Sequence, residues 1–352
     1  MIEIGVYMRK VLATAAAVLG SAIAIAGCSS GSGSSASGGS GSSGSGPVTV
    51  RLGYLANITH APALIAVKNG YFTKALGSAG TLKTSVYTSG TQETTAILAG
   101  QLDAAYVGPN PAINAWQKSG GKAIKIVSGA AAGGASFVVK SSISKASQLK
   151  GQSVATPSLG NTQDVAARYY LKQNGITTST TGGGEVSIKP TAPNSDAVTE
   201  FKSGQIAGAS EPTPYDSEIV AEGGKVLFRE PGVTTLLMVT QTFLSTHPAI
   251  VSDLLKAQIE ANDFIKSNPA QAEADANAQL AAYTGKPLSS SLLKDAFKET
   301  TFTDDPDATS LTQDAQQATS VGLLSQVSLN GIFDLGPLNA LLKADGQAQV
   351  NS

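Results

Sequence analysis

The chain is poor in the side chains on which most metal sites and many catalytic sites depend. Its 352 residues include one cysteine, two histidines and one tryptophan, and only 14% of them are charged. The two histidines, His60 and His247, lie far apart and show no metal-ligand spacing. The single cysteine, Cys28, leaves no second thiol for a disulfide and no set of thiols for an iron–sulfur cluster. We therefore predict no metal site and no bound cofactor.

The chain also has no excess of charge of one sign, and it lacks two catalytic motifs. The 24 basic residues nearly balance the 25 acidic ones, so the chain has no basic field with which to hold nucleic acid. It has no G-x-x-x-x-G-K-[ST] phosphate loop, and residues 47–352 contain no G-x-S-x-G nucleophile elbow. Beyond the N-terminal segment, no apolar run is long enough to cross a bilayer. We expect neither ATP hydrolysis nor serine-hydrolase chemistry from this chain.

The segment before Cys28 has the order of a bacterial secretory signal. Met8, Arg9 and Lys10 precede an apolar run at residues 11–26, and the run ends in Ile-Ala-Gly-Cys at 25–28. This ending resembles a lipobox, in which the cysteine is acylated and becomes the mature N-terminus. A transmembrane anchor is the alternative, but the run is shorter than the roughly 20 residues that a membrane span needs. We predict a signal peptide at 1–27, starting at Met1 or Met8, and a lipidated Cys28 that holds the protein to the cell membrane.

Residues 28–46 form a predicted tether composed almost entirely of serine and glycine. Ala36 is the one apolar residue between 29 and 46, so this stretch cannot offset the entropy of ordering. From residue 48 on, short apolar runs alternate with amphipathic stretches. We predict strands at 48–55, 82–87, 104–107, 123–128, 226–228 and 236–242, with helices at 61–70, 91–100 and 111–118. This alternation indicates βαβ units, and from His247 onward we predict helices only.

A short sequence segment of the first half of the chain recurs in the second half. Thr-Ala-Ile-Leu-Ala-Gly-Gln-Leu at 95–102 corresponds to Thr-Glu-Phe-Lys-Ser-Gly-Gln-Ile at 199–206, each running from a helix through a Gly-Gln turn into a strand. Asn-Gly at 69–70 likewise has a counterpart at 174–175. Two matches at similar spacing predict two similarly wound α/β lobes. We expect residues 47–140 and 235–352 to form one lobe, residues 141–234 the other, and two crossing strands to join them at a hinge.

Several short motifs occur in a familiar order between residues 47 and 285. They are Arg-Leu-Gly-Tyr at 51–54, His-Ala-Pro-Ala at 60–63, Asn-Gly-Tyr-Phe at 69–72, Leu-Ala-Gly-Gln-Leu-Asp at 98–103 and Leu-Lys-Gly at 149–151. Glu211-Pro212 matches a sixth element only in part, because Ser210 stands where an aromatic residue is common. This order resembles the extracytoplasmic substrate-binding proteins of ABC importers for sulfonates, taurine and nitrate.

The resemblance implies a two-lobed fold of the periplasmic-binding-protein type 2, in which each lobe is a mainly parallel sheet flanked by helices. It also implies a monomer that captures a small molecule between its lobes, is not an enzyme, and delivers its ligand to a membrane permease with ATPase subunits. Two alternatives stay open. One is an enzyme on the same fold, of a pyrimidine-precursor or menaquinone-pathway type. The other is a solute-sensing subunit of a receptor.

The candidate binding residues follow the strands, because ligands of open parallel sheets bind beyond the carboxyl ends of strands, near helix N-termini. Glycine allows close backbone approach there, and Ser, Thr and Asn add donors, although such residues are also ordinary helix caps. In the first lobe the candidates are Asn57, Thr59, His60, Ser89, Gly90, Thr91, Gly108 and Asn110. In the second they are Ser158, Gly160, Asn161, Thr162, Ser195 and Glu211.

These loops contain no arginine or lysine, which favours an aliphatic sulfonate or a taurine-like ligand over an inorganic anion. Glu211 would pair with the ammonium group of an amino-sulfonate, or else make a hydrogen bond within its own lobe.

Overall fold

A computed structural model describes residues 46–352 of the chain. The predictions for the signal peptide, for Cys28 and for tether residues 28–45 lie outside the described residues. Within 46–352, no helix is both long enough and apolar enough to cross a membrane.

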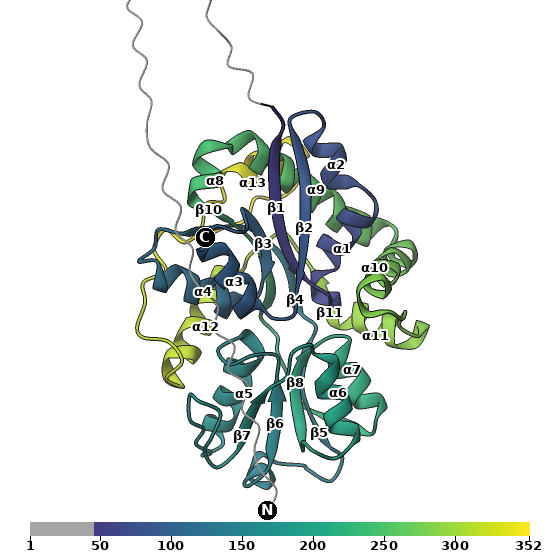
Figure 1. The fold of residues 1–352 in the computed structure, drawn as a ribbon, viewed down its shortest axis with the longest axis vertical. Helices are drawn as coiled ribbons and strands as arrows, with labels where there is room; N and C mark the ends of the chain where they lie inside the picture. Colours follow the sequence, from purple (N-terminus) through teal and green to yellow (C-terminus); the bar gives the residue numbers. More distant parts are fainter. Residues whose placement is uncertain (1–45) are drawn as a thin grey trace, which may run out of the picture. The chain divides into compact units, whose positions relative to one another are not determined.

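The first lobe is built on a six-stranded sheet with the order β11-β4-β10-β3-β1-β2 (Figure 1). Strands β1 and β3 form where they were predicted, and β1 pairs in parallel with both β2 and β3. Strand β10 instead runs antiparallel to β3 and β4. The strand bounds are β1 Val48–Leu55, β2 Gly80–Tyr87, β3 Ala104–Val107, β4 Ile124–Gly133, β10 Val233–Thr240 and β11 Thr300–Phe302.

Helices cover both faces of this sheet. One face packs its buried β1 side chains Val50, Leu52 and Tyr54 against α1, α2, α9 and α10. The other packs Val107 and its neighbours against α3, α4 and α12. The bounds are α1 Ala61–Lys68, α2 Tyr71–Leu76, α3 Gly90–Leu98, α4 Pro109–Lys118, α8 Gln241–Thr246, α9 Pro248–Ser267, α10 Pro269–Thr284, α11 Ser290–Glu299, α12 Ala308–Ser320 and α13 Gly336–Ala344, with a 3₁₀ turn at Ile58–His60.

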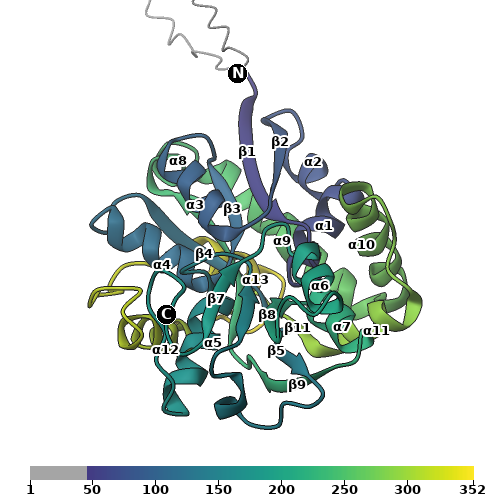
Figure 2. The ribbon, with the colours of Figure 1, turned by 60° about the horizontal axis from the view of Figure 1, so that its bottom comes forward.

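The second lobe is a five-stranded sheet with the order β7-β6-β8-β5-β9, seen in front in Figure 2. Its strands are β5 Ala135–Lys140, β6 Ser153–Thr156, β7 Ser187–Pro190, β8 Gly208–Pro212 and β9 Gly224–Arg229. Its helices are α5 Thr162–Gln173, α6 Ser195–Lys202 and α7 Tyr215–Ala221, with a 3₁₀ turn at Ala146–Leu149. Two apolar clusters, one around Phe137 and one around Val138, fill its two faces because neighbouring residues of a strand point to opposite sides.

The two lobes repeat one topology, as the duplicated sequence phrase indicates. The order β2-β1-β3-β10-β4 in the first lobe corresponds to β7-β6-β8-β5-β9 in the second. Both Gly-Gln turns use a left-handed glycine, with φ of 69° at Gly100 and 78° at Gly204. A left-handed backbone there favours glycine, which has no Cβ to clash. The similar sequence therefore encodes the same helix-to-strand corner twice.

The chain crosses between the lobes twice, from β4 to β5 through Gly133-Gly134 and back from β9 to β10 through residues 230–232. Strand β5 thus hydrogen-bonds within the second sheet, and the return strand β10 begins at Val233. Because the crossing strands enter each sheet from the other lobe, they run antiparallel to their neighbours. Both sheets are consequently mixed, with most of their strands in one direction.

One expectation for the C-terminal part is corrected by the structure. The chain is not purely helical after His247, because Thr300–Phe302 forms β11 and pairs antiparallel with the end of β4. A strand of three residues is too short to leave a periodic pattern in the sequence. Its position at the edge of the sheet beside Gly133 places it next to the hinge.

Candidate functional site

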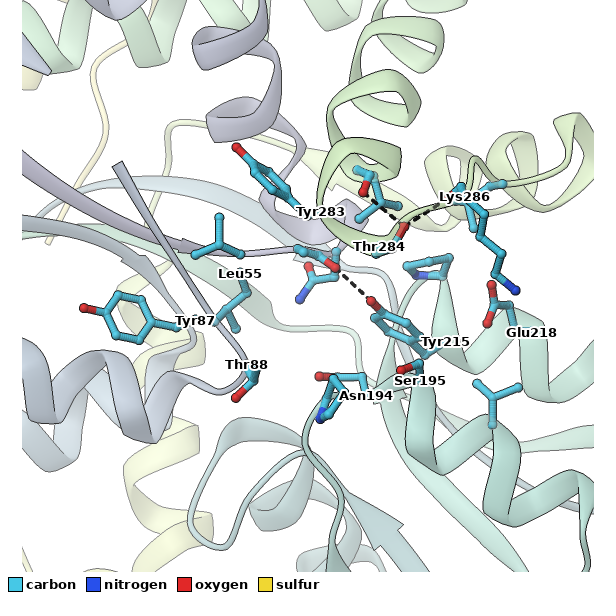
Figure 3. A pocket seen from close by; sticks show the side chains of 18 of the residues that line it. Leu55, Tyr87, Thr88, Asn194, Ser195, Tyr215, Glu218, Tyr283, Thr284 and Lys286 are labelled. Atoms are coloured by element: carbon cyan, nitrogen blue, oxygen red, sulfur yellow. Dashed lines mark hydrogen bonds between the residues drawn. The ribbon is translucent and has the colours of Figure 1, made fainter. Parts of the chain in front are cut away.

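A cavity of about 420 Å³, called here the interlobe pocket, lies between the two lobes (Figure 3). The first lobe contributes the ends of β1 and β2 and the chain after α10, and the second contributes the beginning of α6 and one side of α7. Its walls include Leu55, Asn57, Tyr87, Thr88, Asn194, Ser195, Tyr215, Glu218, Tyr283 and Lys286. A small molecule bound there would contact both lobes.

Direct hydrogen bonds hold the lobes together beside this pocket. The Tyr215 hydroxyl, on α7, donates to the carbonyl oxygen of Ala56 at the end of β1, over 3.0 Å. The Ile58 N–H donates to the carbonyl oxygen of Thr213 at 2.9 Å. Figure 3 shows the Tyr215 ring at the boundary between the two lobes. Tyr215 is therefore both a wall of the pocket and a link between the lobes.

The chemistry of the interlobe pocket is mixed. Leucine and valine side chains from both lobes, among them Leu55 and Val198, give it apolar surface. Asn194 and Ser195 stand where α6 begins, so backbone N–H groups that lack a partner within the helix are close by. The amino group of Lys286 turns toward the Glu218 carboxyl (Figure 3). Burial raises the pKa of Glu218, and the Lys286 charge opposes that rise.

A second and much smaller interlobe space, the inner cavity, has a volume of about 20 Å³, enough for about one water molecule. It shares Leu55, Asn57 and Asn194 with the interlobe pocket, so the two are neighbours within one cleft. The candidates that line it come from both lobes: Asn57, Thr59, His60, Gly90, Gly108, Asn161 and Thr162. Of the remaining candidates, Ser195 lines the interlobe pocket, and the others line neither space.

The candidates after β1 form a hydrogen-bonded group. The Thr59 hydroxyl donates to Oδ1 of Asn57 at 2.8 Å, and Nδ1 of His60 accepts the N–H of Leu55 at 3.2 Å. His60 is 2% exposed, and its burial lowers the pKa of its imidazole to about 3. A neutral histidine with Nδ1 already occupied holds the turn after β1 rather than carrying charge.

Several candidates are engaged as helix caps or lobe contacts. Oγ of Ser89 accepts the N–H of Gln92 at 3.4 Å, and Oδ1 of Asn161 accepts the N–H of Asp164 at 2.9 Å. The N–H of Gly160 donates to the Asp164 carboxylate at 2.7 Å. The hydroxyls of Thr91 and Ser158 lie 2.9 Å apart across the cleft.

Two glycines let backbone and side chains approach closely near the cleft. A Cβ on Gly108 would lie 2.4 Å from Oγ1 of Thr162, and one on Gly90 would lie 2.9 Å from Pro111. Since real Cβ contacts are essentially never below 3 Å, the approach at Gly108 requires glycine. That approach brings the first-lobe loop before α4 against the start of α5 in the second lobe.

Asn110 and Glu211 are buried and lie behind the cleft. Nδ2 of Asn110 donates to the backbone oxygen of Asp314 at 3.2 Å. Oε2 of Glu211 accepts from Nδ2 of Asn194 at 2.7 Å, while its Oε1 is buried without a partner. Burial raises the pKa of Glu211 well above its ordinary value. Its contact reaches the pocket only through Asn194.

No sequence motif marks Tyr87, Glu218, Tyr283 or Lys286 as pocket residues. Tyr283 and Lys286 stand at the end of α10, far in sequence from every candidate loop, and folding alone brings them to the cleft. Glycine and proline around Lys286 signalled the end of a helix but nothing about its neighbours. The missing basic residue of the candidate loops is thus supplied from a distant segment.

Comparison with known proteins places this geometry in a family. Residues 43–282 match the NMT1-like family over more than half of the chain. The chain belongs to the NMT1-like family. No curated protein matches it by sequence.

Solved structures show the same fold at low sequence identity. The alkanesulfonate-binding protein SsuA from Xanthomonas axonopodis pv. citri, bound to MOPS, aligns with a TM-score of 0.68 at 15% identity, covering 83% of this chain and 100% of that one. The periplasmic nitrate-binding protein NrtA from Synechocystis PCC 6803 gives 0.68 at 15%, covering 85% and 89%. A mutant of DszB in complex with biphenyl-2-sulfinic acid gives 0.61 at 16%, covering 84% and 99%. The predicted periplasmic-binding-protein fold is confirmed.

Proposed function

We propose that this protein is the extracytoplasmic solute-binding component of an ABC importer and that it captures a small organic anion in the interlobe pocket. The observation that carries the proposal is the pocket itself. Its 420 Å³ fall within the range of about 300–1,000 Å³ typical of small-molecule sites, and both lobes supply its walls. The likeness to alkanesulfonate- and nitrate-binding proteins of the same fold supports it.

The pocket suits an organic anion better than an inorganic one. Leu55, Val86 and Leu280 would cover an alkyl chain, and burying such a chain contributes about 0.8 kcal/mol for each CH₂ group. A nitrate ion has no apolar group that these walls could bury. The inner cavity, at about 20 Å³, is too small for either kind of ligand while the lobes are in contact as they are here.

The anionic end of the ligand has two sources of stabilisation. Asn194 and Ser195 at the start of α6 offer amide and hydroxyl donors at the end of the helix where its dipole favours negative charge. The N–H groups of Asp196 and Ala197 already donate to the carbonyl oxygens of Pro193 and Asn194. Lys286 adds a positive charge from the other lobe, beside the carboxyl of Glu218. Glu211 acts as a positioning residue, because its carboxyl accepts from Nδ2 of Asn194 and fixes that side chain at the wall.

Capture follows from the two-lobed construction. A ligand between α6 and the end of α10 touches both lobes at once, so it stabilises their contact by its differential affinity for the closed form. The bond from Tyr215 to Ala56 strengthens the same contact. The closed form would then present a surface built by both lobes to a permease. A lipid on Cys28 and the Ser/Gly tether would keep the receptor close to that permease.

An enzyme on this fold is the second candidate, because a mutant of DszB bound to a sulfinic acid shares the architecture. In the part of the chain that the structure describes, His60 is the one histidine that lines the cleft, and its Nδ1 already accepts the N–H of Leu55. Product analysis by mass spectrometry after incubation with each ligand found to bind would reveal turnover. Recovery of every ligand unchanged would support a solute-binding protein rather than an enzyme.

A thermal-shift panel tests the proposed ligand class. The panel contains butanesulfonate, octanesulfonate, taurine, sulfate, nitrate and bicarbonate. We expect an alkanesulfonate to raise the melting temperature most, since a ligand at 100 times its dissociation constant stabilises the folded state by about 2.7 kcal/mol. A shift with nitrate or sulfate alone would contradict the proposal of an organic anion.

A further inference from the structure

A third cavity, of about 290 Å³, lies against the hinge and shares one lining residue, Thr162, with the inner cavity. It is formed by α5 of the second lobe, by α12 on the first lobe and by the segment that joins β9 to β10. We call it the hinge pocket and define it by Tyr169, Tyr170, Phe228, Glu230, Gln313 and Asp314. It shares no lining residue with the interlobe pocket.

The hinge pocket is lined by the carboxyl groups of the buried Glu230 and the half-buried Asp314. Glu230 is 7% exposed, and its carboxyl oxygens accept from Gln163 and Ser210, each at 3.3 Å. Asp314 differs, because its Oδ2 atom is buried and accepts no hydrogen bond. Burial raises the pKa of both groups, and repulsion from Glu230 raises the pKa of Asp314 further. A buried oxygen without a hydrogen-bond partner costs free energy. A cationic donor at Oδ2 would remove that cost and would favour the ionised form of Asp314.

No basic side chain of the described residues supplies that donor. Arg229 is the one basic residue that lines the hinge pocket, and its Nη1 donates to Glu299 at 2.5 Å and to Ser136 at 3.2 Å. Its guanidinium is therefore committed to the bridge between β9 and the end of α11. Gln163, which donates to Glu230, does not hydrogen-bond to Asp314.

Aromatic rings form another wall. Tyr170 and Phe228 are stacked, with ring centroids 5.1 Å apart and planes within 7° of parallel, and Tyr169 adds a further ring. Aromatic faces attract cations through their quadrupole, and the attraction grows when water is excluded. Rings beside two carboxyl groups, one of them with an unpartnered oxygen, in a cavity close to the size of a small-molecule site, match the chemistry of an organic ammonium.

We propose that the hinge pocket binds a small organic cation, whose ammonium group donates to Oδ2 of Asp314 and whose body packs on Tyr170 and Phe228. The walls come from both lobes and from the strand connection between them, so the shape of the pocket depends on the lobe arrangement. Occupation of the hinge pocket is therefore coupled to closure of the interlobe pocket, and by linkage the coupling acts equally in both directions.

Isothermal titration of the full chain with benzylammonium tests the proposal, with benzyl alcohol and benzoate as probes of the same shape without the positive charge. We expect benzylammonium to bind one site and both controls to bind at least tenfold more weakly. Asp314→Asn should weaken benzylammonium at least tenfold, because it removes the acceptor charge at constant shape. Asp295→Asn, which removes the same charge from the exposed part of α11, should leave the affinity unchanged.

Gln317→Lys provides a second variant that keeps both carboxyls and places a tethered ammonium on the wall of the hinge pocket. It should compete with benzylammonium and weaken it at least tenfold, even if Asp314→Asn proves unstable in circular dichroism. Failure of benzylammonium to bind, or equal binding to wild type and both hinge-pocket variants, overturns the proposal. Loss of binding in Glu218→Gln alone would place the cation in the interlobe pocket and equally contradict it. Alkanesulfonate binding to the interlobe pocket is measured separately, so either proposal can fail alone.

Discussion

The interlobe pocket and the hinge pocket are built alike but differ in their ionisable groups. Both take their walls from the two lobes, and both combine apolar or aromatic surface with a few ionisable groups. The interlobe pocket carries Lys286, Glu218 and the start of α6, whereas the hinge pocket carries the carboxyls of the buried Glu230 and the half-buried Asp314. The near balance of charge in the whole sequence hides this difference. Local placement of a few charges, rather than net charge, sets which ligand each region can hold.

Forcing the lobes apart at Gly108 should have the largest effect on alkanesulfonate affinity. The Cβ of Gly108→Val would lie 2.4 Å from Oγ1 of Thr162, so the lobes cannot meet as they do here. We expect alkanesulfonate affinity to fall about 100-fold or more, with the unfolding temperature of the free protein little changed. Titration calorimetry and circular dichroism measure the two quantities. Gly46→Val, at a position with open space around it, is the matched control. Unchanged affinity in Gly108→Val would show that closure at this contact is not required.

The buried acid of the hinge pocket should make stability depend on pH. Burial raises the pKa of Glu230 from 4.5 to about 7, so between these values the folded protein keeps a proton that the unfolded chain releases. The contribution of Glu230 to stability is therefore present below pH 4.5 and falls, by about 3 kcal/mol, as pH rises to 7.

Urea unfolding at pH 5 and pH 8 measures this effect. Wild type should lose more stability between the two than Glu230→Gln, while the interlobe variant Glu218→Gln should follow wild type more closely. Parallel curves for wild type and Glu230→Gln would contradict the assignment of a raised pKa to Glu230.

Removing one hydroxyl should have a smaller effect on the interlobe pocket. Tyr215→Phe keeps the ring at the wall but deletes the hydrogen bond to Ala56, which is worth about 1 kcal/mol. We expect alkanesulfonate affinity to fall about fivefold and benzylammonium affinity to change less, as two titrations of the same variant would show. A loss greater than about 50-fold would mean that the hydroxyl contacts the ligand directly.

The smallest effect is expected at Glu211. Burial raises the pKa of its carboxyl and favours the protonated form, and glutamine has nearly the same shape as a protonated glutamate. Glu211→Gln should therefore change butanesulfonate affinity by less than about threefold, because Nδ2 of Asn194 still finds an acceptor. A loss of tenfold or more in the same titration, for taurine in particular, would show that Glu211 carries charge and pairs with the ligand.

The parts of the fold that repeat locally were predictable from the sequence. Strands β1 and β3 lie where the apolar patterns of 48–55 and 104–107 place them, and the two Gly-Gln turns form equivalent corners. The duplication sufficed to predict two lobes. The mixed character of the sheets and the short strand β11 were not predictable in this way, because strand direction and edge pairing depend on contacts between distant segments.

The residues of the cleft were likewise predictable from the sequence only in part. The rule that ligand loops follow parallel strands led to Asn57, Gly108 and Thr162, which the structure brings to one cavity. The larger pocket beside it depends on Tyr283 and Lys286, which reach the cleft only through the packing of α10 on α1. The hinge pocket depends likewise on α12 packing against α5. No local pattern in the sequence marks either helix as a wall.

Filling the interlobe pocket tests the central claim most directly. Ser195 lines the pocket at the start of α6, and Ser203 is exposed just beyond the other end of that helix. Butanesulfonate is titrated into wild type, Ser195→Trp and Ser203→Trp by calorimetry. We predict one butanesulfonate site in wild type and in Ser203→Trp, and no measurable binding of butanesulfonate to Ser195→Trp. Equal binding of butanesulfonate to both variants would contradict it.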